Sequence, residues 1–290
     1  MPELPEVEHV KKGITPFAEG QTIIDIYYSV QVFQGKKEGR QTIIKGNTLE
    51  DFSKYAISYT IEKIERRSKY ILFHLRKDSN KRIIVGHLGM AGGFFIVNNI
   101  EDIPVENYRK HWHVAFKLDN DMLLVFSDIR RFGELRNIGT YDGYPSLKEI
   151  APEPFDDSAY AHFMHKLNQK SVQSKPIKQV ILDHRVISGC GNIYACEALF
   201  NAKLHPATKV KQLSDDDKTC VFQEIVDVLK LGIKYGGTSV TNYRHADGNE
   251  GTMQDRLQVY KKHTCPVCRT PIRREIIGKR NTHYCPNCQN

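Results

Sequence analysis

The stretch His111-Trp-His-Val-Ala-Phe-Lys-Leu-Asp-Asn-Asp-Met-Leu-Leu-Val-Phe126 decides the fold of the first half of this 290-residue chain. Large apolar residues stand at every second position over 112–118, which is typical of a strand with one buried face. The polar run 119–121 supplies a turn, and a second apolar strand follows over 122–126. The pattern therefore predicts an antiparallel hairpin.

Short segments with the same period lie before this hairpin, around 23–28, 59–64, 70–75, 82–86 and 94–97. A short helix is predicted ahead of them over 5–14, because Val7, Val10 and Ile14 share one helical face. Several short strands joined by turns are typical of an antiparallel sandwich or barrel. We expect an N-terminal helix plus an antiparallel β-sandwich domain.

The pattern becomes helical beyond a loop at 141–155. Ser214 and Asp217 resemble a capping box, an apolar stripe follows, and Gly236-Gly237 ends that helix. The predicted fold class is therefore α+β with a C-terminal helical domain. The expected ranges are a sandwich domain at 1–140, a linker at 141–155, a helical domain at 156–248 and a cysteine-bearing end at 249–290.

Four of the seven cysteines form two pairs, Cys265-Pro-Val-Cys268 and Cys285-Pro-Asn-Cys288. Two such turns at this separation are typical of a structural zinc site with four thiolate ligands, and disulfide bonds or a redox pair are the alternatives. The residues between them predict a β-hairpin that turns near Gly278. We expect one structural Zn²⁺ ion.

The remaining cysteines, Cys190, Cys196 and Cys220, lie in helical patterns and are expected to be small buried side chains. A reducing cytoplasm suits all seven. No run of 18 apolar residues and no secretion leader occurs, so we expect no membrane partner.

The charge of the chain points to an anionic partner. The formal net charge is +8, and residues 261–290 carry seven Lys or Arg against one Glu. Basic charge gathered on a compact module is typical of a phosphate-binding surface.

The segment Pro2-Glu3-Leu4-Pro5-Glu6-Val7 places two carboxylates within four residues of Pro2. If Met1 is removed, Pro2 carries a free secondary amine, and a terminal amine has a pKa near 8 against about 10.4 for lysine. Such an amine attacks an electrophilic carbon and forms a cationic iminium. The alternative is that these residues only start a helix.

Five motifs occur in one order along the chain. They are Pro2-Glu-Leu-Pro-Glu-Val-Glu8, His87-Leu-Gly-Met-Ala-Gly92, Asp128-Ile-Arg-Arg-Phe-Gly133, Gly191-Asn-Ile-Tyr-Ala-Cys-Glu-Ala-Leu-Phe200 and the four-cysteine hairpin. Together they resemble the bacterial formamidopyrimidine-DNA glycosylases, in the family that also contains endonuclease VIII. The resemblance covers residues 2 to about 289 and implies a bifunctional DNA glycosylase and AP lyase of base excision repair, with a helix–two-turn–helix unit near 177–203.

The resemblance also implies catalytic roles. Pro2 would attack C1′ of a damaged nucleotide, and Glu3 would be the general acid and base. Glu6 would order the terminal amine, although a charge at a helix start is the alternative for it. Lys69 would contact the DNA backbone beside the lesion. The alternative for Lys69 is a lysine that is only exposed to solvent.

DNA contacts are implied as well. His87, Asn192 and Arg280 would bind the DNA, with Asn192 and Arg280 as phosphate clamps. An enzyme that attacks C1′ must extrude the nucleotide, and the resulting gap would be filled by Met90, Arg130 and Phe132. Met90 and Phe132 could instead be core residues.

The lesion preference is less constrained. Leu4, Arg130 and Phe132 agree with the formamidopyrimidine branch, so we expect 8-oxoguanine and formamidopyrimidines as substrates. Gly251-Thr-Met in the predicted lesion loop 243–254, the segment 261–264 and the connection 76–82 depart from the family pattern. The alternatives are an endonuclease VIII-like enzyme for oxidised pyrimidines and a non-catalytic damaged-DNA-binding protein. We expect a monomer that binds damaged double-stranded DNA in the cytoplasm, at the nucleoid.

Overall fold

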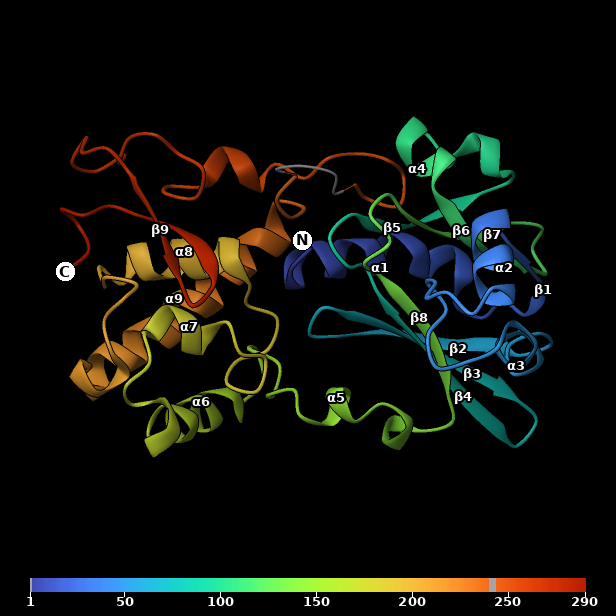
Figure 1. Ribbon diagram of the computed structural model, residues 1–290, viewed down its shortest axis with the longest axis horizontal. Helices are drawn as coiled ribbons and strands as arrows, with labels where there is room; N and C mark the ends of the chain where they lie inside the picture. Colours follow the sequence, from blue (N-terminus) through green and yellow to red (C-terminus); the bar gives the residue numbers. More distant parts are fainter. Residues whose placement is uncertain (1, 240–243) are drawn as a thin grey trace. The chain divides into compact units, whose positions relative to one another are not determined.

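The computed structural model describes residues 2–239 and 244–290, and the chain divides into two compact units (Figure 1). The first unit comprises Met1–Lys148 and Gly236–Thr252, and the second comprises Glu149–Tyr235 and Met253–Asn290. The segment after the long helix of the second unit therefore returns to the first unit. The four predicted domain ranges stay predictions.

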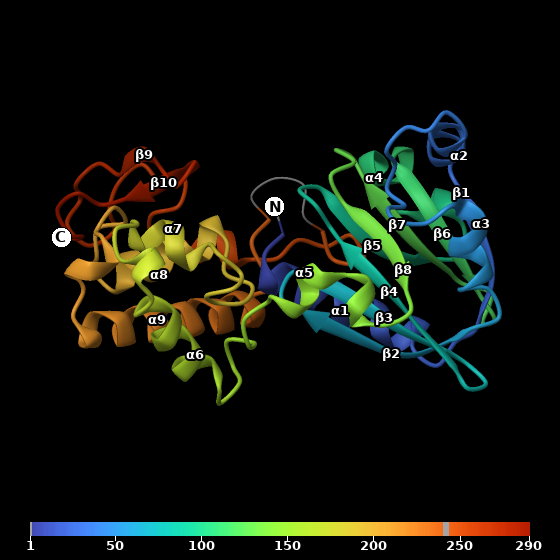
Figure 2. The same cartoon turned by 60° about the horizontal axis from the view of Figure 1, so that its bottom comes forward.

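Two four-stranded antiparallel sheets form the first unit (Figure 2). One has the order β1-β6-β7-β5, with bounds Ile23–Tyr28, Trp112–Leu118, Leu123–Asp128 and Gly92–Val97. The other has the order β2-β3-β4-β8, with bounds Thr60–Arg67, Tyr70–Lys77, Asn80–His87 and Glu134–Ile138. The predicted strands are confirmed, and β8 is an additional strand.

Apolar side chains from both sheets fill the space between them. The rings of Phe73 and Phe94 lie 5.3 Å apart, and those of Phe94 and Phe126 lie 4.9 Å apart. Helix α1, Leu4–Ala18, belongs to the same core, since Val10 and Ile14 are fully buried. The hydrophobic effect therefore fixes the N-terminal helix to the sandwich.

Helix α1 continues four residues beyond its predicted end at residue 14. Pro16 lacks an N–H but lies in the last turn, where the Glu19 N–H still reaches the Thr15 carbonyl at 3.1 Å. Short helices that the sequence did not predict also occur in the first unit: α2 at Val30–Lys37, α3 at Leu49–Lys54, α4 at Glu106–Lys110 and α5 at Pro145–Lys148. Two 3₁₀ turns accompany them, at Ile100–Asp102 and Tyr141–Gly143.

Helices dominate the second unit. They are α6 at Ala159–Leu167, α7 at Ile177–Ile181, α8 at Asn192–Asn201 and α9 at Asp215–Lys234, with 3₁₀ turns at Lys170–Val172, Val210–Gln212 and Met253–Arg256. The predicted capping box starts α9, because Ser214 Oγ accepts from the Asp217 N–H. The helix ends just before Gly236 and Gly237, whose backbone φ angles are +76° and +79°. No described helix is long and apolar enough to cross a bilayer.

Strands β9, Arg273–Ile277, and β10, Arg280–Tyr284, form the predicted hairpin. Gly278 and Lys279 form its turn, and both have a positive φ. A side chain at Gly278 would clash with Gln179 of α7, because its Cβ would lie 2.9 Å from the Gln179 Cβ. The hairpin turn is therefore packed tightly against α7.

Two expectations about the other cysteines were wrong. Cys190 is buried but lies in the loop before α8, outside any helix. Cys220 is exposed on α9, because the buried face of that helix runs through Val221, Ile225 and Leu229. Cys196 is buried, as predicted.

Candidate active site

Glu6 fastens the start of the chain to a distant turn of the same unit. Its Oε2 accepts the Glu3 N–H at 2.7 Å, and its Oε1 accepts the Thr238 N–H at 2.6 Å. The Glu6 side chain is 1% exposed. Gly237 leaves room for it, because a Cβ there would lie 2.9 Å from Glu6 Oε1. Both carboxylate oxygens therefore hold backbone groups.

Pro2 and Glu3 are buried beside this carboxylate. Glu3, 2% exposed, is the N-cap residue of α1, and Pro5 lies in the first helical turn. The helix-start role that the sequence left as an alternative is thus present. The contact of Glu6 with Thr238 goes beyond capping, since it fixes the N-terminal residues to the chain after α9. Pro2, Glu3 and Glu6 are therefore buried together at the start of α1.

Lys69 and His87 lie at one end of the second sheet. Ser68 and Lys69 form the turn between β2 and β3, and Ser68 has a φ of +56°. The next residue, Tyr70, pairs with His87 across the strands, and their ring centroids lie 4.9 Å apart. Register therefore places the turn lysine beside the last residue of β4.

The imidazole of His87 is neutral at physiological pH. Burial lowers the pKa of His87 to about 4, and the charges of Lys69 and Lys45 act in the same direction while Glu134 opposes them. Nδ1 accepts the Gly89 N–H at 3.2 Å, so Nε2 carries the proton. His87 can thus donate one hydrogen bond without adding charge.

The loops that carry Met90 and Phe132 lie against each other. A Cβ on Gly89 would lie 2.4 Å from the Gly133 nitrogen, so only glycine permits this approach. Asp128, fully buried, shapes the second loop by accepting the N–H groups of Arg130 at 3.0 Å and Gly133 at 2.7 Å. Sequence reasoning missed this role of Asp128.

The predicted gap-filling side chains project from these two loops. Met90 is 37% exposed and Phe132 is 54% exposed, so neither is a core residue. The Arg130 guanidinium lies 4.9 Å from the Phe132 ring centroid, within cation–π range. An exposed thioether, ring and guanidinium on adjacent loops suit insertion into a base stack.

Asn192 and Arg280 are brought together in the second unit. Asn192 opens α8, and its Nδ2 donates to the Asn281 carbonyl at 2.8 Å, next to exposed Arg280. Lys178, fully buried, donates to the Asn192 carbonyl at 3.2 Å and fixes the same loop from inside. The hydrogen bond thus joins the start of α8 to the strand that carries Arg280.

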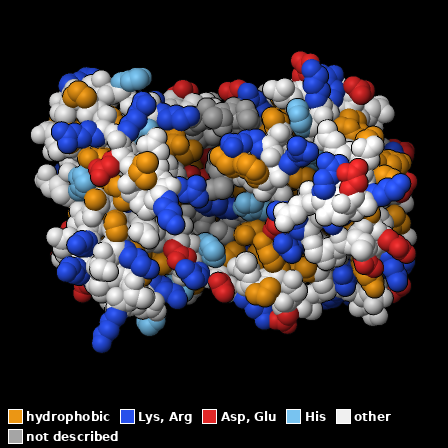
Figure 3. Space-filling view, in the orientation of Figure 1, with side chains coloured by type: hydrophobic (Ala, Val, Ile, Leu, Met, Phe, Trp, Pro, Cys, Tyr) orange, Lys and Arg blue, Asp and Glu red, His pale blue; other side chains and the backbone are white. Residues whose placement is uncertain are grey.

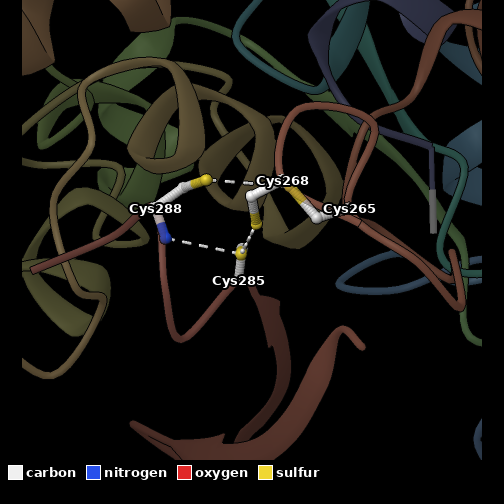
Figure 4. Close-up of side chains that lie close together, drawn as sticks. All are labelled: Cys265, Cys268, Cys285 and Cys288. Atoms are coloured by element: carbon white, nitrogen blue, oxygen red, sulfur yellow. Dashed lines mark hydrogen bonds between the residues drawn. The ribbon is translucent and has the colours of Figure 1, made fainter. Parts of the chain in front are cut away.

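The four predicted zinc ligands converge from two turns (Figure 4). Their sulfur atoms lie within 4.8 Å of one another, with 3.8 Å between Cys265 and Cys288 and 3.4 Å between Cys268 and Cys285. A tetrahedral zinc ion with Zn–S bonds of about 2.3 Å separates its ligands by roughly 3.8 Å, whereas a disulfide needs about 2.05 Å. The residues fit one Zn²⁺.

Glu197 is a further buried carboxylate that sequence reasoning missed. It lies on α8 and is 1% exposed. Its oxygens accept the N–H groups of Gln258 at 2.6 Å, Val259 at 3.1 Å and Tyr260 at 2.8 Å. Glu197 therefore fixes the segment that leads into the first cysteine turn.

Glu197→Gln should destabilise the second unit by about 2–4 kcal/mol, because an amide replaces one acceptor oxygen with a donor and leaves buried N–H groups unpaired. Urea unfolding measures the change. Exposed Glu149, in the same unit, provides the control Glu149→Gln, which should unfold like the original chain. Equal stability of the two variants would show that the three hydrogen bonds contribute nothing.

The predicted lesion loop, 243–254, is described only in part, because Tyr243 lies outside the described residues. His245 Nε2 lies 2.7 Å from the Gly236 carbonyl oxygen. A Cβ on Gly251 would lie 2.2 Å from the Gly237 oxygen, so this position requires glycine. Gly251 thus permits a close approach of two backbone segments.

Lys and Arg side chains are spread over the visible face of both units (Figure 3). This distribution agrees with the formal charge of +8. Such surfaces attract polyanions without base specificity.

Three family models match the chain in order. The Formamidopyrimidine-DNA glycosylase N-terminal domain matches residues 1–135, and the Formamidopyrimidine-DNA glycosylase H2TH domain matches residues 150–244. The zinc finger found in FPG and IleRS matches residues 262–290.

Individual proteins match along their full lengths. The formamidopyrimidine-DNA glycosylase of Streptococcus thermophilus (strain CNRZ 1066) is 36% identical over 294 residues, which cover 100% of this chain and 99% of that protein. A Lactococcus lactis FPG mutant in complex with Fapy-dG containing DNA is 33% identical with a TM-score of 0.84, covering 100% of both chains. Wild-type Lactococcus lactis FPG in complex with an oxidized pyrimidine containing DNA is 33% identical with a TM-score of 0.83, again covering 100% of both.

Proposed function

Because this chain belongs to the formamidopyrimidine-DNA glycosylase family, we propose that Pro2, Glu3, Glu6 and Lys69 carry its chemistry. The protein is a DNA glycosylase and AP lyase of base excision repair that acts on damaged DNA. The observation that carries the residue assignment is the pair of hydrogen bonds by which buried Glu6 fixes Glu3, the residue after Pro2, and Thr238.

The first step replaces the bond from C1′ to the damaged base. The amine of Pro2, freed by removal of Met1, forms a bond to C1′ and loses its N–H proton, while the base leaves with its bonding electrons and takes up a proton. Glu3 protonates O4′ as the sugar ring opens, which yields an iminium between Pro2 and C1′. Glu6 holds the backbone next to the amine, because both of its oxygens accept backbone N–H groups.

The lyase steps follow from the iminium. Its positive charge acidifies the C2′ proton, whose loss expels the 3′ phosphate by β-elimination. A further proton loss then expels the 5′ phosphate by δ-elimination, and water releases the sugar fragment from Pro2. Glu3 is positioned to take part in these proton transfers.

The DNA is held by contacts to its backbone. Lys69 and neutral His87 bind phosphates beside the lesion, while Asn192 and Arg280 form a second clamp. Met90, Arg130 and Phe132 fill the gap that the extruded nucleotide leaves. The zinc ion is structural, because four thiolates leave no open coordination position, and it supplies only folding energy to the hairpin that carries Arg280.

Oxidised purines are the proposed substrates, and the Arg130 guanidinium favours cytosine opposite the lesion. The solved complex of a relative with Fapy-dG containing DNA supports this choice. Another relative binds an oxidized pyrimidine containing DNA, so pyrimidine lesions are the second candidate. We place the protein in the bacterial cytoplasm, acting as a monomer at the nucleoid.

Borohydride trapping tests the proposal. Protein processed to Pro2 should form a covalent adduct with duplexes that contain 8-oxoguanine opposite cytosine, because borohydride reduces the iminium to a stable amine. The adduct should form faster with this duplex than with one that contains thymine glycol opposite adenine, because oxidised purines are the proposed substrates. Mass spectrometry of the digested adduct should locate the sugar on Pro2. Protein that retains Met1 is the matched control and should give no adduct. An adduct on a lysine, or none with processed protein, would exclude Pro2 as the nucleophile.

A further inference from the structure

Four side chains from four neighbouring strands lie in one row across the sheet that carries His87. Arg67 of β2 pairs with Tyr70 of β3. Tyr70 pairs with His87 of β4, and His87 pairs with Glu134 of β8. Directly paired residues of antiparallel strands share one face of a sheet. The predicted DNA contact of His87 is therefore flanked by an aromatic ring and a carboxylate.

Tyr144 contacts this row from the segment that follows β8. Its hydroxyl donates to Glu134 Oε1. Its ring meets the Tyr70 ring edge-on, at 82° and 5.9 Å between centroids. The Arg136 guanidinium lies 4.8 Å from the centroid of the Tyr144 ring. Tyr144 thus contacts Glu134 and Tyr70, the two residues that flank His87 in the row, although Tyr144 itself lies outside the row.

The protonation states of Tyr144 and Glu134 decide which of the two donates the hydrogen bond between them. Burial acts to raise the pKa of Glu134, but the Tyr144 hydrogen bond and the charges of Arg136 and Lys45 outweigh it and hold this pKa below its ordinary value. Burial, followed by the hydrogen bond to Glu134, raises the pKa of Tyr144. At neutral pH Tyr144 is the donor and the Glu134 carboxylate is the acceptor.

The Glu134 carboxylate acts on the pKa of His87. Glu134 is 8% exposed and lies beside His87 in the row, where its charge opposes the lowering of the His87 pKa by burial, Lys69 and Lys45. The Tyr70 ring limits the other side of the imidazole. Glu134 therefore acts on the charge of His87, and Tyr70 acts on the position of its ring.

We propose that Tyr144 is a positioning residue for DNA binding. By holding the Glu134 carboxylate and the Tyr70 ring, it keeps the His87 imidazole oriented so that Nε2–H points to a backbone phosphate. This inference rests on the proposed contact of His87 with DNA. It gives the segment after β8, which the sequence marks as a linker, a direct effect on the binding site.

A double-mutant cycle tests the inference. The variants are Tyr144→Phe, His87→Gln and the pair, with Tyr141→Phe from the same segment as the control. The affinity is measured for a duplex with a tetrahydrofuran abasic-site analogue opposite cytosine. Tyr144→Phe should weaken binding about three- to tenfold in the original chain, the net size of one ordinary hydrogen bond, and should have no effect when His87 is glutamine. Tyr141→Phe should bind like the original chain.

NMR titration of the imidazole supplies a readout independent of DNA. The His87 pKa should move in Tyr144→Phe and stay in place in Tyr141→Phe. Equal losses of affinity from Tyr144→Phe in both backgrounds, or an unmoved His87 titration, would overturn the inference. If His87→Gln alone binds the DNA with the original affinity, His87 makes no contact with DNA. The NMR titration would then still decide whether Tyr144 acts on this histidine.

Discussion

Glu3→Gln should lower the rate of base excision by about 10²–10⁴-fold, the contribution expected of a positioned general acid. The amide cannot protonate O4′, so the Pro2 amine still faces C1′ but the sugar ring opens slowly. Single-turnover excision of 8-oxoguanine opposite cytosine measures this loss. Affinity for a duplex with a tetrahydrofuran abasic-site analogue should stay near that of the original enzyme, because no phosphate contact is removed.

Loss of the helix cap accounts for only part of such a change. Glu3 is the N-cap residue of α1, and cap substitutions cost about 1 kcal/mol of stability, which thermal unfolding reports separately. Glu8, in the same helix as the cap, provides the matched control: Glu8→Gln removes the ion pair of Glu8 with Arg66 of β2 and should leave excision intact. Excision at the original rate in Glu3→Gln would assign the proton transfer to another group.

Cys265→Ser should remove the zinc ion and weaken DNA binding by on the order of 100-fold, as two phosphate contacts are lost. The fully buried Cys265 sulfur lies 3.8 Å from that of Cys288, and a structural zinc site supplies most of the folding energy of such a module. Without the metal, Arg280 and the Asn281 carbonyl that binds Asn192 lose their fixed positions.

Metal analysis and the salt dependence of binding test this expectation. The slope of log Kd against log salt should fall by roughly 1 to 2, in line with the lost phosphates. Cys220→Ser, which changes an exposed cysteine of α9, is the control and should retain zinc and affinity. Unchanged affinity and slope in Cys265→Ser would refute the role of the hairpin in DNA binding.

Regular patterns in the sequence explain which elements could be predicted. The strand over 112–118 shows an alternating pattern, β7 shows a short apolar run because both of its faces are buried, and the β9–β10 turn is marked by Gly278. Helices α2 and α3 escaped prediction because eight and six residues are too few to display a helical period. Their start signals, Ser29 and Thr48, are visible only after the helices are known.

The candidate site divides in the same way. Glu3, Glu6 and the zinc cysteines stand in compact motifs, whereas Glu197 acts through partners about sixty residues further along the chain. Glu197 binds backbone N–H groups of residues 258–260, and no local pattern announces such a contact. A buried carboxylate that holds distant amides is therefore the class of residue that sequence reasoning misses.

The hydrogen bond between Glu6 and Thr238 can form only late in the synthesis of the chain. Residues 2–6 are among the first to leave the ribosome, and Met1 is exposed to aminopeptidase at that stage. Thr238 emerges more than two hundred residues later, and only then is the second oxygen of Glu6 occupied. Under the proposed role of Pro2, a nascent chain carries the amine early but gains the hydrogen bond that fixes Glu6 to Thr238 only near the end of synthesis, so an incomplete translation product lacks that anchor.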